Sequence, residues 1–283
     1  MKLVRFGELG RERPGLIDGE GRIRDLSRHL ADLTPDWLSA EKLADLAAMD
    51  PERLPIVAPS RFGVPISGTR QFIAIGVNYF DHATETGQPI PTEPVMFTKA
   101  VSCLQGPNDI VRKPRGAARM DWEVELGVVI GARASYVSKG DALKHVAGFV
   151  ICHDLSERSF QMERGGTWDK GKGCETFGPV GPWLVTRDGV GDPQNLDMWL
   201  DVNGRRMQTG NTRTMIFDCA TIVAYASQFM VLLPGDIITT GTPPGVGMGM
   251  RPEVYLQEGD VIELGISKLG RQMHTVVAWD HGR

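Results

Sequence analysis

Cysteine is scarce in this chain of 283 residues, and no two of its four cysteines lie close together in sequence: Cys103, Cys152, Cys174 and Cys219. The chain therefore has no CxxC pair of the kind that commonly binds zinc. It also lacks the cysteine density of a disulfide-stabilised secreted domain. We expect four reduced cysteines that act as packing residues.

Long apolar runs are missing as well. No stretch approaches the roughly 18 apolar residues that a membrane-spanning helix needs, and the N-terminus has no signal-peptide core. We therefore expect no membrane contact and a cytoplasmic protein. Basic residues form no block, and 31 of them stand against 35 acidic residues. Nucleic acid is therefore not an expected partner.

The N-terminal part of the chain reads as a small α+β unit. Short strands are expected at residues 2–6 and within 15–26. Thr34 and Pro35 form a helix start, because a capping residue precedes a proline at the first helical position. We expect this helix to continue to about Met49.

A linker follows this unit. Residues 55–68 carry three prolines and two glycines, which favour turns and extended chain over helix or sheet. The sequence therefore predicts a small N-terminal domain and linker at 1–68 and a main domain at 69–283.

The main domain is rich in strand patterns separated by glycine and proline turns, with few helices. Strands and helices do not alternate regularly, which argues against a TIM barrel or a Rossmann sheet. The pattern predicts a mixed β or α+β fold with peripheral helices. Strands are expected at 71–77, 95–98, 121–131, 147–152, 181–187, 196–202, 205–208, 237–240, 261–267 and 272–279, and helices at 155–163 and 216–230.

The stretch 121–131 combines an apolar strand with three acids at alternate positions, Asp121, Glu123 and Glu125. Alternate residues of a strand share a face, so these carboxylates would point the same way. Like charges that enter a core repel one another and lose hydration. A hard divalent cation bound by Glu123 and Glu125 would remove both costs. The alternative is a solvated edge with the acids facing water.

Asp154 is the next acid at a strand end, directly after the apolar run 147–152 and His153. Together with Glu123 and Glu125 it would complete an all-carboxylate set. Such a set suits Mg²⁺, Mn²⁺ or Ca²⁺ better than zinc or copper. The alternative role of Asp154 is to cap the helix expected at 155–163.

Two other groups could complete an active site. His82 and Glu85 are three residues apart, so they would be neighbours on a helical turn that Gly87 ends. They could form a general base with an orienting carboxylate, or a weak pair on a surface helix. The second group contains Arg158, Gln161 and Lys172, which could hold an anionic substrate, although Arg158 and Gln161 could also be a surface helix face.

Five motifs together resemble the fumarylacetoacetate hydrolase family. They cover roughly residues 70–280 in the family's order and spacing. The motifs are GVNYFDHATETG, DWEVELGVVIG, HDLSERSFQ, GKGCETFGPVGPW and GDIITTGTPPGVG. The resemblance implies a mixed β-roll with peripheral helices. It also implies a homodimer or dimer of dimers, Mg²⁺ or Mn²⁺ as cofactor, and a small dioxo-acid substrate that chelates the metal.

The resemblance also implies roles for particular residues. The metal ligands would be Glu123, Glu125 and Asp154. Lys172, His82 and Glu85 would be catalytic, with the His–Glu pair on a lid that activates water. Arg158, Gln161 and Thr242 would contact the substrate. Two positions depart from the family pattern, because His153 replaces an asparagine and Glu175 replaces an aspartate.

The segment ERSFQMERGGTWDKGKG is similar to one subgroup of the family. That subgroup includes ureidoglycolate lyase-like proteins and hydrolases of 2,4-diketo-3-deoxy sugar acids of the L-rhamnonate or L-fuconate type. The expected reaction is metal-dependent cleavage of a carbon–carbon bond to pyruvate and a hydroxy acid such as lactate. Alternatives are an oxaloacetate-type decarboxylase or an enol–keto tautomerase on the same metal site, and a non-catalytic metal- or ligand-binding protein.

Overall fold

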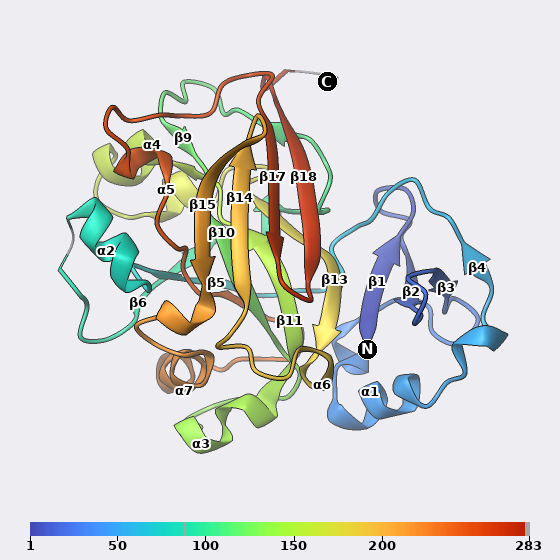
Figure 1. The fold of residues 1–283 in the computed structure, drawn as a ribbon. Helices are drawn as coiled ribbons and strands as arrows, with labels where there is room; N and C mark the ends of the chain where they lie inside the picture. Colours follow the sequence, from blue (N-terminus) through green and yellow to red (C-terminus); the bar gives the residue numbers. More distant parts are fainter. Residues whose placement is uncertain (88, 281–283) are drawn as a thin grey trace.

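Two β-sheets with short helices around them make up the computed structural model, which describes residues 1–87 and 89–280 (Figure 1). The larger sheet is mixed, since β16 and β5 pair in parallel while most neighbours are antiparallel. In spatial order it contains β4 (Ile56–Val57), β3 (Ile23–Asp25), β2 (Arg13–Ile17), β1 (Lys2–Phe6), β13 (Gly178–Thr186), β11 (Val146–His153), β10 (Val124–Ile130), β16 (Ile237–Thr239), β5 (Phe72–Gly76) and β6 (Val95–Lys99), and β7 (Leu104–Gln105) pairs with β13.

The second sheet lies across the middle of the first, so that β14, β17 and β18 cover β10, β11 and β13 (Figure 1). Its strands in spatial order are β15 (Arg205–Asn211), β14 (Asp197–Val202), β17 (Val261–Ile266), β18 (Gly270–Val277) and β8 (Val111–Arg112). A short ribbon pairs β9 (Met120–Asp121) with β12 (Ser156–Glu157). The main apolar core fills the space between the sheets, with strand β10 buried along its whole length. The expected mixed α+β class is confirmed.

The helices are short and peripheral. They are α1 (Ala40–Ala47), α2 (Phe80–Thr86), α3 (Lys139–Ala142), α4 (Arg158–Glu163), α5 (Asp169–Lys172), α6 (Arg187–Val190) and α7 (Cys219–Phe229), with 3₁₀ turns η1 (Pro35–Trp37), η2 (Pro51–Arg53), η3 (Val101–Cys103), η4 (Leu143–His145), η5 (Thr212–Thr214) and η6 (Gly247–Gly249). Within residues 1–87 and 89–280, no helix has the length and apolarity to cross a bilayer. All four cysteines are free.

The expected single helix from Thr34 to Met49 is wrong, because two elements occupy this range. The turn η1 ends at Trp37, and α1 begins only at Ala40. Leu38 is buried, and its carbonyl lies so close to Gly131 that a Cβ there would approach it to 2.6 Å. Ser39 then caps α1 by accepting the N–H of Lys42. Packing on the main body therefore interrupts the helix.

The N-terminal segment lies to one side of the main body, and its strands extend the large sheet through β1 and β13 (Figure 1). The division into 1–68 and 69–283 stays a prediction, and residues 281–283 lie outside the described part.

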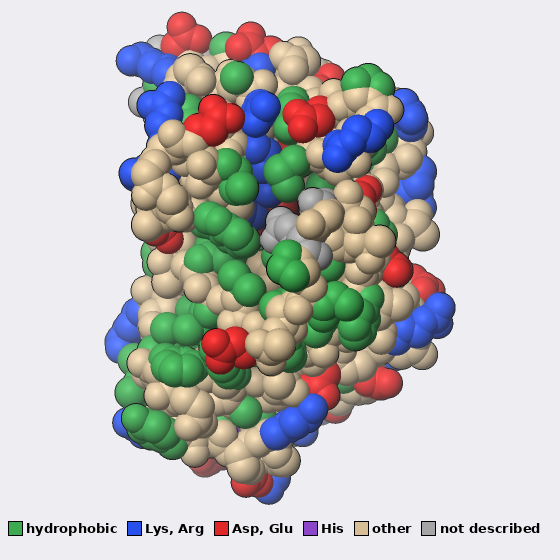
Figure 2. Space-filling view, turned by 90° about the vertical axis from the view of Figure 1, so that its left-hand side faces the viewer, with side chains coloured by type: hydrophobic (Ala, Val, Ile, Leu, Met, Phe, Trp, Pro, Cys, Tyr) green, Lys and Arg blue, Asp and Glu red, His purple; other side chains and the backbone are tan. Residues whose placement is uncertain are grey.

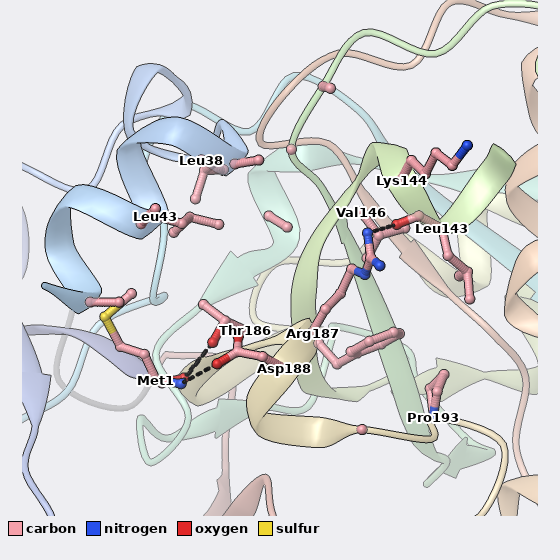
Figure 3. A pocket seen from close by; sticks show the side chains of 18 residues that line it. Met1, Leu38, Leu43, Leu143, Lys144, Val146, Thr186, Arg187, Asp188 and Pro193 are labelled. Carbon is pink, nitrogen blue, oxygen red and sulfur yellow. Dashed lines mark hydrogen bonds and ion pairs between the residues drawn. The ribbon is translucent and has the colours of Figure 1, made fainter.

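Where α1 meets β11 and α6 there is an apolar cleft of about 690 Å³ (Figure 3). Leu38 and Leu43 line one side of it, and Leu143 and Val146 line the other. The Met1 ammonium donates to the Thr186 hydroxyl at its base (2.7 Å).

The acidic strand is also interrupted, which corrects the expected continuous strand at 121–131. β9 ends at Asp121 and β10 begins at Val124, with Trp122 and Glu123 between them. Asp121 accepts the N–H groups of Trp122 (2.8 Å) and of Gly247 (2.7 Å). These bonds hold its carboxylate against the loop at 241–249, so Asp121 does not share the position of Glu123 and Glu125.

Candidate active site

Three buried carboxylates meet where β10 and β11 run side by side. Glu123, Glu125 and Asp154 each offer an oxygen within 4.8 Å of the others, and each residue is at most 5% exposed. The antiparallel register pairs Glu125 with Cys152, and the Asp154 N–H donates to the Glu123 carbonyl (3.0 Å). Sheet pairing therefore brings together acids that are about thirty residues apart. The solvated-edge alternative is wrong for Glu123 and Glu125.

Cationic side chains converge on this acidic cluster, which we define as Glu123, Glu125 and Asp154. The Lys172 ammonium lies 2.7 Å from both Glu123 and Asp154. Arg158 contacts Glu123 through Nη2 (2.6 Å) and Asp121 through the same atom (2.8 Å). A third cation, Lys99, is fully buried and forms an ion pair with Asp154. Burial makes such pairing necessary, since an unpaired charge in the interior is costly.

The carboxylates outnumber these cations by one, because Asp121 adds a fourth acid to the three of the cluster. Burial alone would raise the pKa of Glu123, but Lys172 and Arg158 outweigh it and hold this pKa below its usual range. Glu125 differs, since burial and repulsion from Asp154 and Glu123 raise its pKa well above the usual range.

The donor set therefore fits a divalent cation. Three carboxylate oxygens crowd together, and Glu125 lacks the compensating charge that its neighbours have. Hard oxygen ligands of this kind favour an ion such as Mg²⁺, Mn²⁺ or Ca²⁺. Glu125 is meanwhile held by the Thr239 hydroxyl and by the Gly241 N–H (2.8 Å), which both donate to one of its oxygens. The other oxygen stays available to an ion.

Helix α4 places two predicted substrate residues beside the cluster. Arg158 and Gln161 are buried, and the Arg158 guanidinium donates to the Gln161 side-chain oxygen (3.0 Å). The surface-face alternative for this pair is wrong. The capping alternative for Asp154 is also wrong, because α4 begins at Arg158 and is capped by Glu157.

His82 and Glu85 lie on α2, which ends at Gly87 in the left-handed conformation (φ 67°), as expected. His82 Nδ1 lies 3.5 Å from the Glu85 carboxylate. Both oxygens of that carboxylate accept the Gly245 N–H (3.0 Å each). Helix α2 is thus docked on the glycine-rich loop at 241–249, which also carries Thr242. The Thr242 hydroxyl donates to the Val124 carbonyl (2.9 Å).

The cluster opens into a hollow of about 30 Å³, which we call the acidic hollow. Eight of the nine predicted site residues line it: His82, Glu123, Glu125, Asp154, Arg158, Gln161, Lys172 and Thr242. The ninth, Glu85, does not line the hollow itself but contacts His82. Figure 2 shows the face of the molecule that carries α2, where charged side chains of both signs gather on the upper part. The roles of these residues stay predictions.

Two residues near the cluster were not identified from the sequence. Lys99 ends β6, and a single lysine at a strand end resembles a surface residue. Trp168 belongs to a glycine-rich segment, yet its ring lines the acidic hollow. The only available signals were a lysine directly after an apolar strand and a large aromatic residue between glycines.

His153, the departure from the family pattern, is not among the residues that line the hollow. Its ring is fully buried and lies 5.4 Å from that of His274 on β18. Burial and the nearby His274 hold the pKa of His153 well below its usual range. His153 is therefore a neutral core residue here.

Comparison with known proteins agrees with this geometry. The model of the fumarylacetoacetate (FAA) hydrolase C-terminal family matches residues 71–277. A Sphingomonas protein named 2,4-didehydro-3-deoxy-L-rhamnonate hydrolase is 56% identical over 283 residues, covering 99% of this chain and 98% of its own. Among solved structures, fumarylacetoacetate hydrolase from Exiguobacterium antarcticum is 34% identical (TM-score 0.88, coverage 98% and 99%). A 2-hydroxyhepta-2,4-diene-1,7-dioate isomerase from Mycobacterium marinum is 30% identical (TM-score 0.76, full coverage of both).

Proposed function

The chain belongs to the fumarylacetoacetate hydrolase family, and from that premise we propose that it hydrolyses the C3–C4 bond of a 2,4-dioxo acid. The proposed substrate is a 2,4-diketo-3-deoxy sugar acid of the L-rhamnonate type, and the products are pyruvate and lactate. The observation that carries this proposal is the His82–Glu85 pair beside a buried three-carboxylate cluster. The name and high identity of the Sphingomonas relative support the choice of substrate.

Glu123, Glu125 and Asp154 would hold Mg²⁺ or Mn²⁺. When bound, this ion supplies Lewis acidity that polarises carboxylate and carbonyl oxygens. The protein's contribution is to hold three buried carboxyl groups close together in a fixed arrangement. Lys172 and Arg158 contribute to this, because each donates to Glu123 from a buried position.

His82 is the proposed general base. Glu85 faces its Nδ1 and so favours the tautomer that leaves Nε2 free to accept a proton. A water deprotonated at Nε2 attacks the C4 carbonyl carbon and forms the new C–O bond. The docking of Glu85 on Gly245 holds His82 over the hollow. Substrate entry into so small a space then requires α2 to move away.

The C3–C4 bond then breaks, and its electron pair passes to C3 as a pyruvate enolate. The Lys172 ammonium stabilises the enolate charge, since it is buried where the dielectric is low. A proton returned to C3 gives pyruvate, and the C4 fragment leaves as a carboxylic acid. Overall, one water is consumed and one carbon–carbon bond is broken.

The rival activities on the same site are decarboxylation and tautomerisation. Tautomerisation has specific support, because the similar Mycobacterium marinum structure is named as an isomerase. Of the three reactions, only hydrolysis forms lactate, and it places a solvent oxygen in the new carboxylate of that product. We therefore propose to supply 2,4-diketo-3-deoxy-L-rhamnonate in ¹⁸O-labelled water and to analyse both products by mass spectrometry. Pyruvate together with singly labelled lactate is the expected result. Substrate that is isomerised or decarboxylated without labelled lactate would refute the hydrolase assignment.

A homodimer is a further proposal. Strand β6 is the last strand of the large sheet in the part of the chain described here. The exposed apolar side chains Phe80, Ile90, Val95 and Phe229 lie on segments around it. Figure 2 shows hydrophobic side chains gathered over the middle and lower parts of this face. Light scattering tests the proposal, and a monomeric mass would reject it.

A further inference from the structure

Beyond its charged groups, the acidic hollow has an apolar wall. Its apolar lining residues are Ile75, Val77, Phe97, Met162, Trp168 and Met248. The carboxylate and 2-oxo groups of a dioxo acid would be directed at the ion that the acidic cluster would hold and at Arg158 and Lys172 beside it, because the apolar residues offer no positive charge to bind them. The substituent on C4 would then meet the apolar wall.

Trp168 is the largest side chain of this wall, and its position is fixed by close packing. A Cβ at Gly76 would lie 2.4 and 2.9 Å from atoms of its six-membered ring, so glycine at 76 makes room for the indole. The Phe97 ring meets it edge-on, with centroids 5.1 Å apart and an interplanar angle of 66°. Such a ring cannot easily retreat from a bulky ligand.

The backbone of Trp168 also belongs to the turn that carries Lys172. Its carbonyl accepts the N–H groups of Gly171 (2.9 Å) and Lys172 (3.2 Å). Gly171 lets this turn approach α4, because a Cβ there would lie 2.6 Å from that of Gln161. The backbones of Trp168 and Lys172 therefore belong to one turn that packs against α4.

The wall offers no positive charge of its own. The two cations that line the hollow are Arg158 and Lys172. Both are already paired with carboxylates of the site, at 2.6–2.8 Å. A second carboxylate on the substrate would have to lose its hydration against apolar groups, which is costly.

We propose that Trp168 is a specificity-determining residue, and that it restricts the C4 substituent of the substrate to a small, uncharged group. This inference rests on the proposed function and deepens it. The methyl end of a 6-deoxy sugar acid meets this restriction, whereas an aromatic or carboxylated C4 substituent does not.

The test compares three probes: 2,4-dioxopentanoate, 2,4-dioxo-4-phenylbutanoate and 2,4-dioxohexanedioate. Pyruvate release is measured for the metal-loaded wild type, Trp168→Ala and Trp168→Phe. Trp37→Ala is the matched control, since Trp37 is also a half-buried tryptophan but lies in the N-terminal segment. The wild type should prefer the methyl over the phenyl probe by at least about tenfold in kcat/KM.

Trp168→Ala should reduce the methyl-to-phenyl preference by about tenfold, mainly through a lower KM for the phenyl probe. Trp168→Phe and Trp37→Ala should keep the wild-type preference. The dicarboxylate should stay a poor substrate for every variant, because removing the indole adds space but no charge. Gly76→Ala should shift the preference in the same direction as Trp168→Ala by displacing the ring, and it provides the test if Trp168→Ala does not fold.

The outcomes separate this inference from the proposed function. If the wild type cleaves the methyl probe but Trp168→Ala leaves the preference unchanged, the specificity role is overturned and the hydrolase survives. Equal wild-type turnover of the dicarboxylate would overturn the charge argument. If the wild type cleaves none of the probes and also fails on the sugar acid, both the inference and the proposed function fall.

Discussion

Two hollows in this molecule differ in almost every respect. The cleft between α1 and β11 has about 690 Å³ of space and mostly apolar walls. The acidic hollow has about 30 Å³, and six of its lining residues are titratable. In the cleft, Lys144 pairs with Asp141 (2.7 Å) and Arg187 donates to the Leu143 carbonyl, so neither cation is directed at a ligand.

The difference shows that room alone does not make a catalytic site. Polarising a carbonyl and abstracting a proton need charges that are held in place before the substrate arrives. The acidic hollow meets this need through ion pairs between buried groups, whereas the cleft is a mostly apolar space between the N-terminal segment and the main body. Substitutions in the acidic hollow should therefore reduce activity, whereas substitutions in the cleft should not.

Removing one carboxylate of the cluster should have the largest effect. In Glu125→Gln, kcat/KM for pyruvate release should fall by about a thousandfold, equivalent to roughly 4 kcal/mol, because metal binding is weakened. Glu163→Gln is the matched control, since Glu163 is an exposed residue at the end of α4 and forms an ion pair with the half-exposed Arg119. Equal activity of the two variants would refute the proposal that the acidic hollow is the catalytic site.

The general base should come next. His82→Asn should lower kcat by about a hundredfold, as is typical when a positioned base is lost. Metal affinity should stay near that of the wild type, because His82 is not among the three proposed carboxylate ligands. Calorimetric titration with Mn²⁺ separates the two effects. A large loss of metal affinity with normal kcat in saturating metal would contradict the assignment.

Asp121 should have a smaller but measurable effect. Its carboxylate links Arg158 (Nε, 2.9 Å) to the N–H groups of Gly247 and Met248. Asp121→Asn keeps the size and one acceptor oxygen but loses the ion pair. We expect about a tenfold drop in kcat/KM, the lower end of what outer partners of a metal site contribute. Unchanged kcat/KM would show that Arg158 is positioned without Asp121.

Filling the cleft should have the smallest effect. Ala44 and Ala47 line it from α1 and are exposed. The double variant Ala44→Leu/Ala47→Leu should raise the free energy of unfolding by about 1 kcal/mol through added apolar contact. Its kcat/KM should equal that of the wild type. A loss of activity would mean that a structural change in the cleft alters the geometry of the acidic hollow.

Much of the fold was predictable because local signals decide it. The Asn203–Gly204 pair predicted a hairpin turn, and both residues have positive φ (51° and 75°) between β14 and β15. The helix expected at Thr34–Met49 failed because burial of Leu38 against the main body decides its course, and no local pattern records that contact.

The candidate site also contains residues that local sequence patterns predict and residues that only the folded chain brings together. Alternating acids and motif spacing were enough to assemble Glu123, Glu125 and Asp154. Lys99 could not be found, because only the pairing of β5 with β6 brings its ammonium to Asp154. Trp168 was missed for a similar reason, since its ring packs against Gly76, which is about ninety residues away in sequence.

A metal titration of chelator-treated protein tests whether the acidic cluster binds a catalytic ion, with Mn²⁺ binding followed by electron paramagnetic resonance and pyruvate release from 2,4-diketo-3-deoxy-L-rhamnonate followed in parallel. We expect negligible activity without metal, and activity that rises in proportion to bound Mn²⁺ until each chain holds one ion. Full activity in the metal-free protein would contradict this expectation.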